Sequence, residues 1–205
     1  MKTVAVIDYG MCNLDSVKRA VEECGGVPVV TDRAEAIETA THIVLPGVGS
    51  FRDGMHNLKQ RSLDIILREQ VVARHIPFLG ICLGMQMLAT KGWEGGETEG
   101  LGWIDGEVKK LEPTGADRRI PHIGWDEVIV ARPSPLFAGL EQARDFYFVH
   151  SYHFCCRNQS DVLAQTSYCG GFVSAVGRGH EFGVQFHPEK SQRAGFQMLK
   201  NFLSV

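Results

Sequence analysis

The sequence predicts an α/β protein: a doubly wound, mostly parallel sheet flanked by helices, with a small antiparallel β annex. Short apolar runs alternate with helical patterns over residues 1–90, and short β-like runs separated by turns follow between residues 104 and 165. Strands separated by helices pair in parallel through right-handed crossovers, whereas runs of strands joined by turns pair in antiparallel fashion. With 205 residues the chain fits one such domain, and we expect residues 1–205 to form it.

The parallel half begins at the N-terminus. Its expected strands are short apolar runs at residues 4–8, 27–30, 41–45 and 78–80. Its first expected helix has apolar residues spaced three or four apart, which is the period of one helix face: Leu14, Val17, Val21 and Cys24. A second expected helix contains Met55, Leu58, Ile65, Ile66 and Leu67. In a doubly wound sheet the binding site lies beyond the carboxyl ends of the strands.

The second half of the sequence has the pattern expected of the antiparallel β annex. Its β-like runs cover residues 104–108, 120–130, 146–149 and 162–165. A further strand over residues 182–186 runs toward His187, and a last helix follows. That helix places apolar residues on one face: Phe196, Leu199, Phe202 and Leu203.

Charge and composition exclude several functions. With a net charge of −3 and no basic stripe, the chain carries no signal for binding nucleic acid or an anionic membrane. No apolar stretch approaches the ~20 residues that cross a bilayer, and the first residues form a strand pattern rather than a signal peptide. We therefore expect a cytoplasmic protein whose six cysteines are thiols. Apart from the pair His187 and Glu189, no residue spacing suits a metal site, and we expect no cofactor.

Residues 80–84, Gly-Ile-Cys-Leu-Gly, carry the main chemical signal. An apolar run leads into them, and a helical pattern from Met85 to Ala89 leads out. In that context Gly-x-Cys-x-Gly is a cysteine version of the nucleophile elbow, a sharp strand-to-helix turn that holds a nucleophile above the sheet edge. The turn would put the Cys82 sulfur at a helix N-terminus, where the dipole favours the thiolate. Taken alone, the pattern also fits tight packing around a structural cysteine.

The run His187-Pro188-Glu189 supplies the partners that such a nucleophile needs. Pro188 disfavours helix for His187 and predicts an extended segment. In extended chain, residues i and i+2 project to the same side, so Glu189 would accept one imidazole N–H of His187. The other ring nitrogen could then take a proton from Cys82, which predicts a catalytic triad of Cys82, His187 and Glu189. A capped surface histidine and a metal site at His187 and Glu189 are the alternatives, and the metal site would leave Cys82 without a role.

With these motifs the chain resembles the class I (triad) glutamine amidotransferases and, within that class, the glutaminase subunits of imidazole glycerol phosphate synthases of histidine biosynthesis. The elbow and the His-Pro-Glu run are shared across the class and indicate only the reaction. The narrower resemblance rests on runs spread along the whole chain. They are Asp-Tyr-Gly at residues 8–10 with Asn-Leu at 13–14, Leu-Pro-Gly-Val-Gly-Ser-Phe at 45–51, Pro-His-Ile-Gly-Trp at 121–125, Phe-Val-His-Ser-Tyr at 148–152 and Gly-Val-Gln-Phe-His-Pro-Glu-Lys-Ser at 183–191.

One residue departs from this pattern. Many members of the family have glycine where Cys12 stands, in the turn after the first strand. Because a cysteine is poorly suited to a positive φ, we expect this turn to differ locally. The residue lies outside the proposed triad.

The resemblance implies hydrolysis of L-glutamine to glutamate and ammonia by a single glutamine amidotransferase domain. Cys82 would attack the side-chain amide, with His187 taking the thiol proton and then giving one to departing ammonia. Glu189 would steady the imidazolium, and water would split the resulting thioester. The oxyanion needs two donors, the N–H of Leu83 just past the nucleophile and one from Val48 or Gly49.

The resemblance also implies which residues hold the glutamine. Gln86 and the segment Ser151-Tyr152 would make these contacts. Ordinary structural roles, an exposed helix turn for Gln86 and a core position for Tyr152, are the alternatives.

A partner is implied as well. The family pairs with a (β/α)8-barrel cyclase in a heterodimer, and the cyclase uses the ammonia to make imidazole glycerol phosphate and an aminoimidazole carboxamide ribonucleotide. Trp125 and the run 121–125 would line the junction, unless Trp125 belongs to the core. Because glycines flank Val48, we hypothesise that the chain alone is nearly inactive and that substrate on the cyclase flips the Val48 peptide.

Three other functions compete with this one. The first is a related amidotransferase that serves chorismate or a vitamin precursor. The second is a paralogue that serves a surface-sugar pathway. The third is a cysteine redox sensor or binding module without turnover, which would need only Cys82 and could lose His187 or Glu189.

Overall fold

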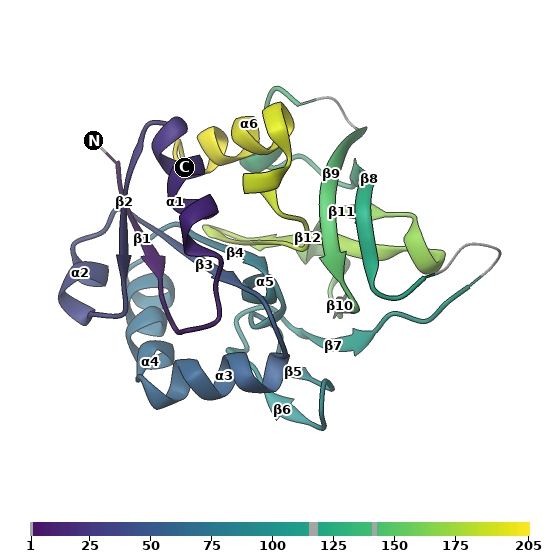
Figure 1. Ribbon diagram of the computed structural model, residues 1–205, viewed down its shortest axis with the longest axis horizontal. Helices are drawn as coiled ribbons and strands as arrows, with labels where there is room; N and C mark the ends of the chain where they lie inside the picture. Colours follow the sequence, from purple (N-terminus) through teal and green to yellow (C-terminus); the bar gives the residue numbers. More distant parts are fainter. Residues whose placement is uncertain (1, 115–118, 141–142) are drawn as a thin grey trace.

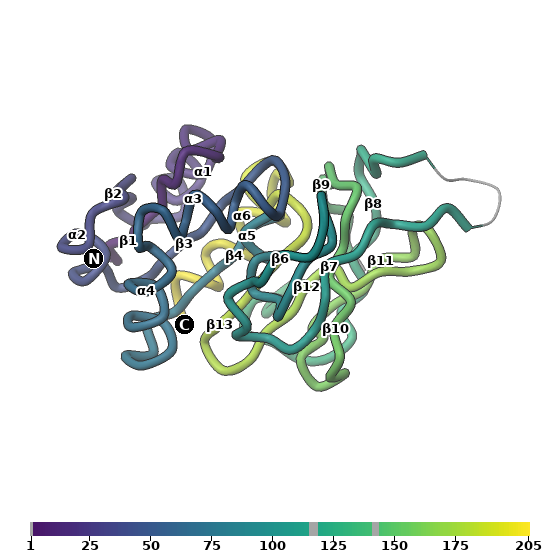
Figure 2. Tube along the Cα trace, turned by 90° about the horizontal axis from the view of Figure 1, so that it is seen from below, coloured from purple at the N-terminus to yellow at the C-terminus, as the bar shows by residue number. Residues whose placement is uncertain are grey.

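The computed structural model describes residues 2–114, 119–140 and 143–205. Figures 1 and 2 show an elongated molecule with most of its helices at one end and a group of strands without such helical cover at the other. One sheet runs through both ends. The active-site residues predicted above come from both of these parts.

The parallel part of the sheet is formed by β1 (Lys2–Ile7), β2 (Gly26–Thr31), β3 (His42–Gly47), β4 (Phe78–Cys82) and β13 (Glu181–Val184). β1 pairs in parallel with β2 and β3, β3 pairs with β4, and β4 pairs with β13. The four strands expected in residues 1–90 are all present. Because β13 lies beside β4, the chain that leads to His187 runs next to the chain that ends at Cys82.

Helices cover both faces of this parallel part (Figure 1). α1 (Leu14–Glu23) and α6 (Gln192–Phe202) pack on one face; α2 (Ala34–Glu38), α3 (Phe51–Gln60) and α4 (Leu63–Leu67) pack on the other. Strand β1 explains the two layers, because Val4 and Val6 belong to one core cluster and Ala5 and Ile7 to the other. Successive side chains of a strand point to opposite faces, so an unbroken apolar run becomes buried on both.

The prediction of one helix through Met55 and Leu67 is wrong. α3 ends at Gln60, Ser62 adopts a φ of 56° in the left-handed region, and α4 is followed by a π-helical turn, η1 (Arg68–Ala73). The change of direction at Ser62 leaves Ile65 exposed while Leu67 stays buried. Apolar spacing alone does not reveal such a break, because buried residues continue on both sides of it.

The β annex is confirmed, with more strands than the sequence predicted. Its strands are β5 (Lys91–Gly92), β6 (Thr98–Glu99), β7 (Gly106–Lys110), β8 (His122–Val130), β9 (Ala143–His150), β10 (Tyr152–Cys156), β11 (Val162–Thr166) and β12 (Phe172–Arg178), with 3-10 turns η2 (Pro135–Phe137), η3 (Gln159–Asp161) and η4 (Tyr168–Gly170) between some of them. The sheet runs in the order β2-β1-β3-β4-β13-β12-β10-β7-β5-β6, while β11 pairs with β12 and β8, and β8 pairs with β9. The pairings from β13 to β12, β10 and β7 are antiparallel, as are those of β11, β8 and β9.

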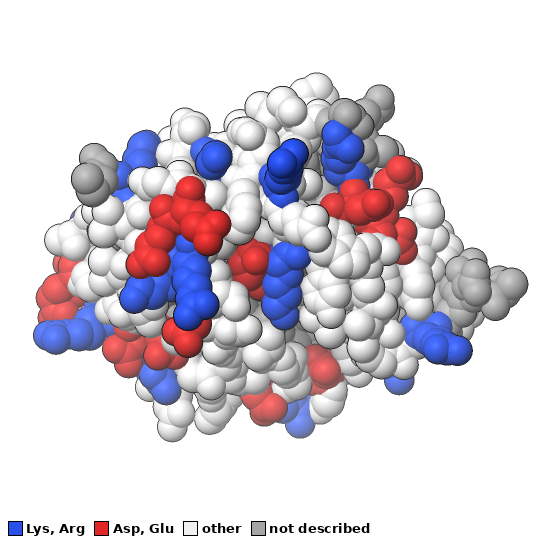
Figure 3. Space-filling view, turned by 45° about the horizontal axis from the view of Figure 1, so that its top comes forward, with Lys and Arg blue, Asp and Glu red and all other residues white. Residues whose placement is uncertain are grey.

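The surface that Figure 3 displays mixes Lys and Arg with Asp and Glu rather than gathering one sign of charge into a broad patch. Within residues 2–114, 119–140 and 143–205, no helix is long and apolar enough to span a membrane. The six cysteines are free thiols. In the same described ranges, no three His, Cys, Asp or Glu side chains form a group that could hold a metal ion.

Candidate active site

Cys82 stands at the sharp turn between β4 and the short helix α5 (Leu83–Gln86). Its backbone has φ 55° and ψ −108°, a strained conformation for a residue with a side chain. A Cβ at Gly84 would collide with the Leu45 carbonyl oxygen, which explains the glycine after the nucleophile position. The expected helix from Met85 to Ala89 is wrong, because α5 ends at Gln86. A helix of four residues has little dipole to offer the sulfur.

The Cys82 side chain is 7% exposed and borders a cavity of about 410 Å³. That volume lies in the range of about 300–1,000 Å³ that small-molecule sites occupy. The sulfur lies 3.6 Å from Nε2 of Gln185 and 3.9 Å from the carbonyl oxygen of Val149. Cys82 is therefore a buried thiol with one face toward a ligand-sized space.

His187 and Glu189 form the predicted pair. Nδ1 of His187 lies 2.8 Å from Oε1 of Glu189, and both side chains are almost fully buried. His187 itself is extended, as predicted, but the extended segment does not continue to Glu189: a 3-10 turn, η5 (Pro188–Lys190), begins directly after His187 and brings Glu189 to the imidazole. The backbone N–H of His187 donates to the Tyr147 carbonyl at 2.8 Å, and the Ser191 hydroxyl donates to the His187 carbonyl at 2.6 Å. These bonds fix the position of the imidazole.

The charge of His187 depends on its neighbours. Burial by itself lowers the pKa of this imidazole, but the attraction of Cys82 and Glu189 for the charged ring outweighs burial and raises the pKa to about 10. Because Nδ1 is bonded to Glu189, the contribution of Cys82 reaches the other nitrogen, Nε2. Nε2 is buried and makes no hydrogen bond within the described residues, so the link between Cys82 and His187 is one of charge. The structure thus brings Cys82, His187 and Glu189 into one electrostatic cluster.

The loop that carries Val48 and Gly49 follows β3 and borders the same cavity. The N–H of Val48 donates to the carbonyl of Met11 at 2.9 Å, so this donor is engaged away from any substrate oxygen. Gly49 has φ +104°, a conformation that favours glycine. Leu83 is the first residue of α5, and its N–H therefore has no partner inside the helix.

Cys12, in the neighbouring turn, does not need a positive φ. Gly10 adopts the positive value, 86°, and Cys12 keeps an ordinary backbone. The Cys12 thiol lies 3.2 Å from the carbonyl oxygen of Pro46, at the start of the Val48 loop. Burial is the main cause that raises the pKa of this thiol to about 11, so it stays protonated at neutral pH. The expected local change is therefore a thiol contact rather than a strained turn.

The residues predicted to hold the substrate all border the cavity: Gln86, Ser151 and Tyr152. Gln86 is buried rather than on an exposed turn. Its Nε2 donates to the Tyr152 carbonyl at 2.8 Å and to Oε1 of Gln185 at 3.0 Å. Tyr152 is half-buried, so it is not a core residue either.

Sequence reasoning missed Glu94, which also borders this cavity. Burial raises the pKa of its carboxyl group, and an oxygen of the group accepts the backbone N–H of Phe51 at 2.8 Å. Among the described residues that line the cavity, Glu94 alone carries a carboxylate. The run Trp93 to Gly96 contains no motif that predicts a place for Glu94 in the site. Only the fold brings this loop to the cavity at Cys82.

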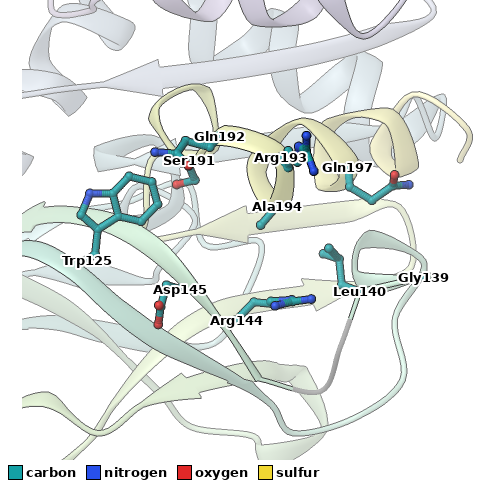
Figure 4. A pocket seen from close by; sticks show the side chains of 10 residues that line it. All are labelled: Trp125, Gly139, Leu140, Arg144, Asp145, Ser191, Gln192, Arg193, Ala194 and Gln197. Carbon is teal, nitrogen blue, oxygen red and sulfur yellow. The ribbon is translucent and has the colours of Figure 1, made fainter.

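A second cavity, of about 750 Å³, lies between the β8–β9 pair and the start of α6, and Cys82 is not part of its lining (Figure 4). Trp125 stands at one end of it and is 47% exposed, which rules out the core position considered for this residue. Ile123, on the same strand, is 60% exposed. The run 121–125 therefore presents large apolar side chains to the outside.

A cysteine at a nucleophile elbow, on a doubly wound sheet that also carries a buried histidine–carboxylate pair, is typical of α/β enzymes that act through a covalent intermediate. The model of the Glutamine amidotransferase class-I family matches residues 5–205, and the chain belongs to this family. The predicted enzyme class is confirmed.

Curated relatives are similar over nearly the whole chain. Imidazole glycerol phosphate synthase subunit HisH of Moorella thermoacetica is 48% identical over 202 residues, which cover 98% of this chain and 94% of that protein. Subunit HisH 1 of Campylobacter jejuni is 43% identical over 98% of this chain and 100% of its own length. Subunit HisH 2 of Pseudomonas aeruginosa is 41% identical, with coverages of 98% and 99%.

Solved structures share the fold. A glutamine amidotransferase structure superimposes with a TM-score of 0.76 at 19% identity and covers 98% of this chain and 99% of its own. PurLQS from Thermotoga maritima gives a TM-score of 0.69 at 18% identity, with coverages of 99% and 98%. The predicted fold class is confirmed.

Proposed function

We propose that this chain is the glutaminase subunit of an imidazole glycerol phosphate synthase. It hydrolyses L-glutamine and passes the ammonia to a (β/α)8-barrel cyclase, with which it forms a cytoplasmic heterodimer. The observation that carries the proposal is the Cys82 thiol, which borders a ligand-sized cavity and couples to the buried pair of His187 and Glu189. Relatives that bear this subunit's name at 41–48% identity over 98% of the chain support the same activity.

In the first half of the reaction, the Cys82 sulfur, whose proton has passed to Nε2 of His187, attacks the side-chain amide carbon of glutamine as a thiolate. With a pKa of about 10, His187 already holds a proton on Nε2 at neutral pH, so it acts first as the acid that protonates the departing ammonia. Glu189 holds the ring by its Nδ1 and stabilises the positive charge.

In the second half, water splits the γ-glutamyl thioester. The neutral His187 accepts a proton from the attacking water, the bond between carbon and sulfur breaks, and its electron pair stays on the Cys82 sulfur. Glutamate leaves, and the imidazolium beside the thiolate is restored. One glutamine and one water thus give one glutamate and one ammonia.

The cavity offers complementary groups for the free end of glutamine. Glu94 fits the α-ammonium group, because it is the carboxylate of this wall. The segment Ser151-Tyr152 and the amide of Gln86 offer backbone and side-chain polar groups along the same wall. We propose that these residues fix the substrate with its side-chain amide over the Cys82 sulfur.

The oxyanion site is incomplete in this conformation. Leu83 supplies one N–H, while the N–H of Val48 is engaged by the Met11 carbonyl. Losing one oxyanion donor typically costs about 10²–10³-fold in turnover. We propose that rotation of the peptide between Gly47 and Val48 turns the N–H of Val48 toward the cavity, or that rotation of the next peptide turns the N–H of Gly49 there, and that the liganded cyclase stabilises this rotated state.

The exposed apolar side chains near this site suit a partner surface. Ile123 and Trp125 lie on β8, and Val48, in the oxyanion loop, is 43% exposed. Apolar side chains of this size gain free energy when a partner covers them. Ammonia is mostly protonated in water at neutral pH and is then no nucleophile, so a covered path to the cyclase keeps it reactive.

The test is to mix the purified chain with a cognate histidine-pathway cyclase and its nucleotide substrate, and to follow imidazole glycerol phosphate formation from glutamine. The proposal predicts glutamine-dependent product and an inactivating label on Cys82 from an electrophilic glutamine analogue, blocked by glutamine. Labelling without product would indicate a paralogue that serves another acceptor. If neither occurs, the glutaminase assignment is wrong.

A further inference from the structure

A buried amide outside the predicted triad contacts the reactive sulfur. Gln185 is 0% exposed and lies between β13 and His187. Its backbone N–H donates to the Ser174 carbonyl at 2.9 Å, and its side-chain Nε2 lies 3.6 Å from the Cys82 sulfur. A polar residue between the buried Val184 and Phe186 would be costly unless its amide is satisfied. This contact is therefore a built feature of the site.

The neighbours of Gln185 decide which end of its amide meets the sulfur. The Tyr152 carbonyl can only accept hydrogen bonds, so the Gln86 group that lies 2.8 Å from it must be the NH₂. The second hydrogen of that NH₂ goes to Gln185 at 3.0 Å, which requires an oxygen there. The other end of the Gln185 amide, facing Cys82, is then an N–H donor.

The same Tyr152 carbonyl accepts a second hydrogen bond, from the annex. Nδ1 of His150 lies 2.9 Å from it and must donate to it. The Nε2 of a neutral His150 is then an acceptor, and it receives Nδ1 of His122 at 3.0 Å. Burial lowers the pKa of His150 to about 3, so the neutral form is the one present at neutral pH. The Tyr152 carbonyl is thus held by His150 from one side and by Gln86 from the other, which keeps the Gln86 amide in place beside Gln185.

Resting on the proposed glutaminase function, we propose that Gln185 is a catalytic residue whose side-chain N–H donates to the Cys82 sulfur and stabilises its thiolate. A hydrogen bond to an ionised acceptor is roughly twice as strong as one to a neutral acceptor. The bond therefore strengthens as sulfur becomes negative, both before attack and when the carbon–sulfur bond of the thioester breaks. His187 stabilises the same sulfur by charge, and Gln185 adds a directional donor that keeps its amide hydrogen throughout.

The test measures the pH dependence of Cys82 alkylation by iodoacetamide, with mass spectrometry of the Cys82 peptide, in the full chain. Gln185→Met keeps the length of the side chain and removes the donor. We expect the pH midpoint of alkylation to rise by about one unit and kcat for glutamine to fall about 10- to 100-fold with little change in KM. Gln185→Asn withdraws the amide by one methylene, and we expect a rise of the midpoint here too, so the test survives if the methionine variant does not fold.

Gln70→Met is the matched control. Gln70 is also buried, and its amide has no hydrogen-bond partner among the described residues, so its loss should leave the alkylation midpoint unchanged. Folded Gln185 variants that alkylate with the wild-type midpoint would overturn the proposal. Because alkylation needs no glutamine turnover, a wild-type chain without glutaminase activity would refute the proposed function while the midpoint still decides the role of Gln185.

Discussion

The two walls of the cavity at Cys82 are built differently. One wall is the Cys82 side chain, which is backed, outside the cavity lining, by Gln185 and by the buried pair of His187 and Glu189. On the other wall, the loop with Val48 is half exposed at its tip and directs its N–H to Met11. Under the proposed function, this difference means that the nucleophile and its histidine–carboxylate pair are already assembled in the free chain, whereas the oxyanion site needs a rearrangement.

Removing the nucleophile should have the largest effect. In Cys82→Ala we expect glutamine-dependent product formation to fall on the order of 10⁴-fold or more, because no other group can form the thioester. The cyclase should still work when ammonium is supplied. Product from glutamine at an undiminished rate would show that the nucleophile lies elsewhere.

Glu189→Gln tests the buried pair of His187 and Glu189 behind the sulfur. The substitution keeps the shape of the side chain but removes the negative charge that helps to raise the pKa of His187. We expect kcat to fall by up to about 10⁴-fold and the basic limb of the kcat–pH profile to move to lower pH. A profile that keeps its wild-type basic limb would contradict the role given to Glu189.

Gly49→Ala tests the loop wall alone. A Cβ at this position would meet Cε of Met11 at 2.5 Å, and the φ of +104° disfavours any residue with a side chain. We expect turnover with the liganded cyclase to fall about 10²-fold, the effect of one oxyanion donor. Alkylation of Cys82 by iodoacetamide should keep its wild-type rate. A parallel loss of both activities would mean that the two walls are not independent.

The free energy of unfolding should change with pH by less than the effects above. Its pH dependence distinguishes the two buried histidines, His187 and His150. The pKa of His187 is raised from 6.5 to about 10, so its stabilising contribution is complete below about pH 6.5 and is lost as the pH rises through 10. The pKa of His150 is lowered from 6.5 to about 3, chiefly by burial, so its contribution is complete above about pH 6.5 and is lost as the pH falls toward 3.

Urea denaturation at a series of pH values measures this effect. We expect the free energy of unfolding to decline on both sides of neutral pH, and Glu189→Gln to reduce the alkaline decline while leaving the acid decline in place. An unchanged alkaline decline in that variant would indicate that Glu189 does not raise the pKa of His187.

Sequence reasoning predicted what local pattern determines. The strands of the parallel half follow from apolar runs, and Cys82 and His187 stand at or just beyond the ends of two neighbouring strands, β4 and β13. It missed what tertiary contacts determine: the break at Ser62, the 3-10 turn that carries Glu189, and the place of Glu94 on the cavity wall. The direction of the Val48 N–H is also determined by a tertiary contact. The flanking glycines allow several directions for this peptide, and the hydrogen bond to the Met11 carbonyl selects one of them.

One experiment compares the two walls directly. Glutaminase turnover and Cys82 alkylation are measured on the chain in complex with the cyclase, with and without the cyclase's nucleotide ligand. The account predicts that the ligand raises turnover by about 10²-fold or more while the alkylation rate barely changes. Comparable turnover with and without ligand, or a rise of alkylation in step with turnover, would contradict it.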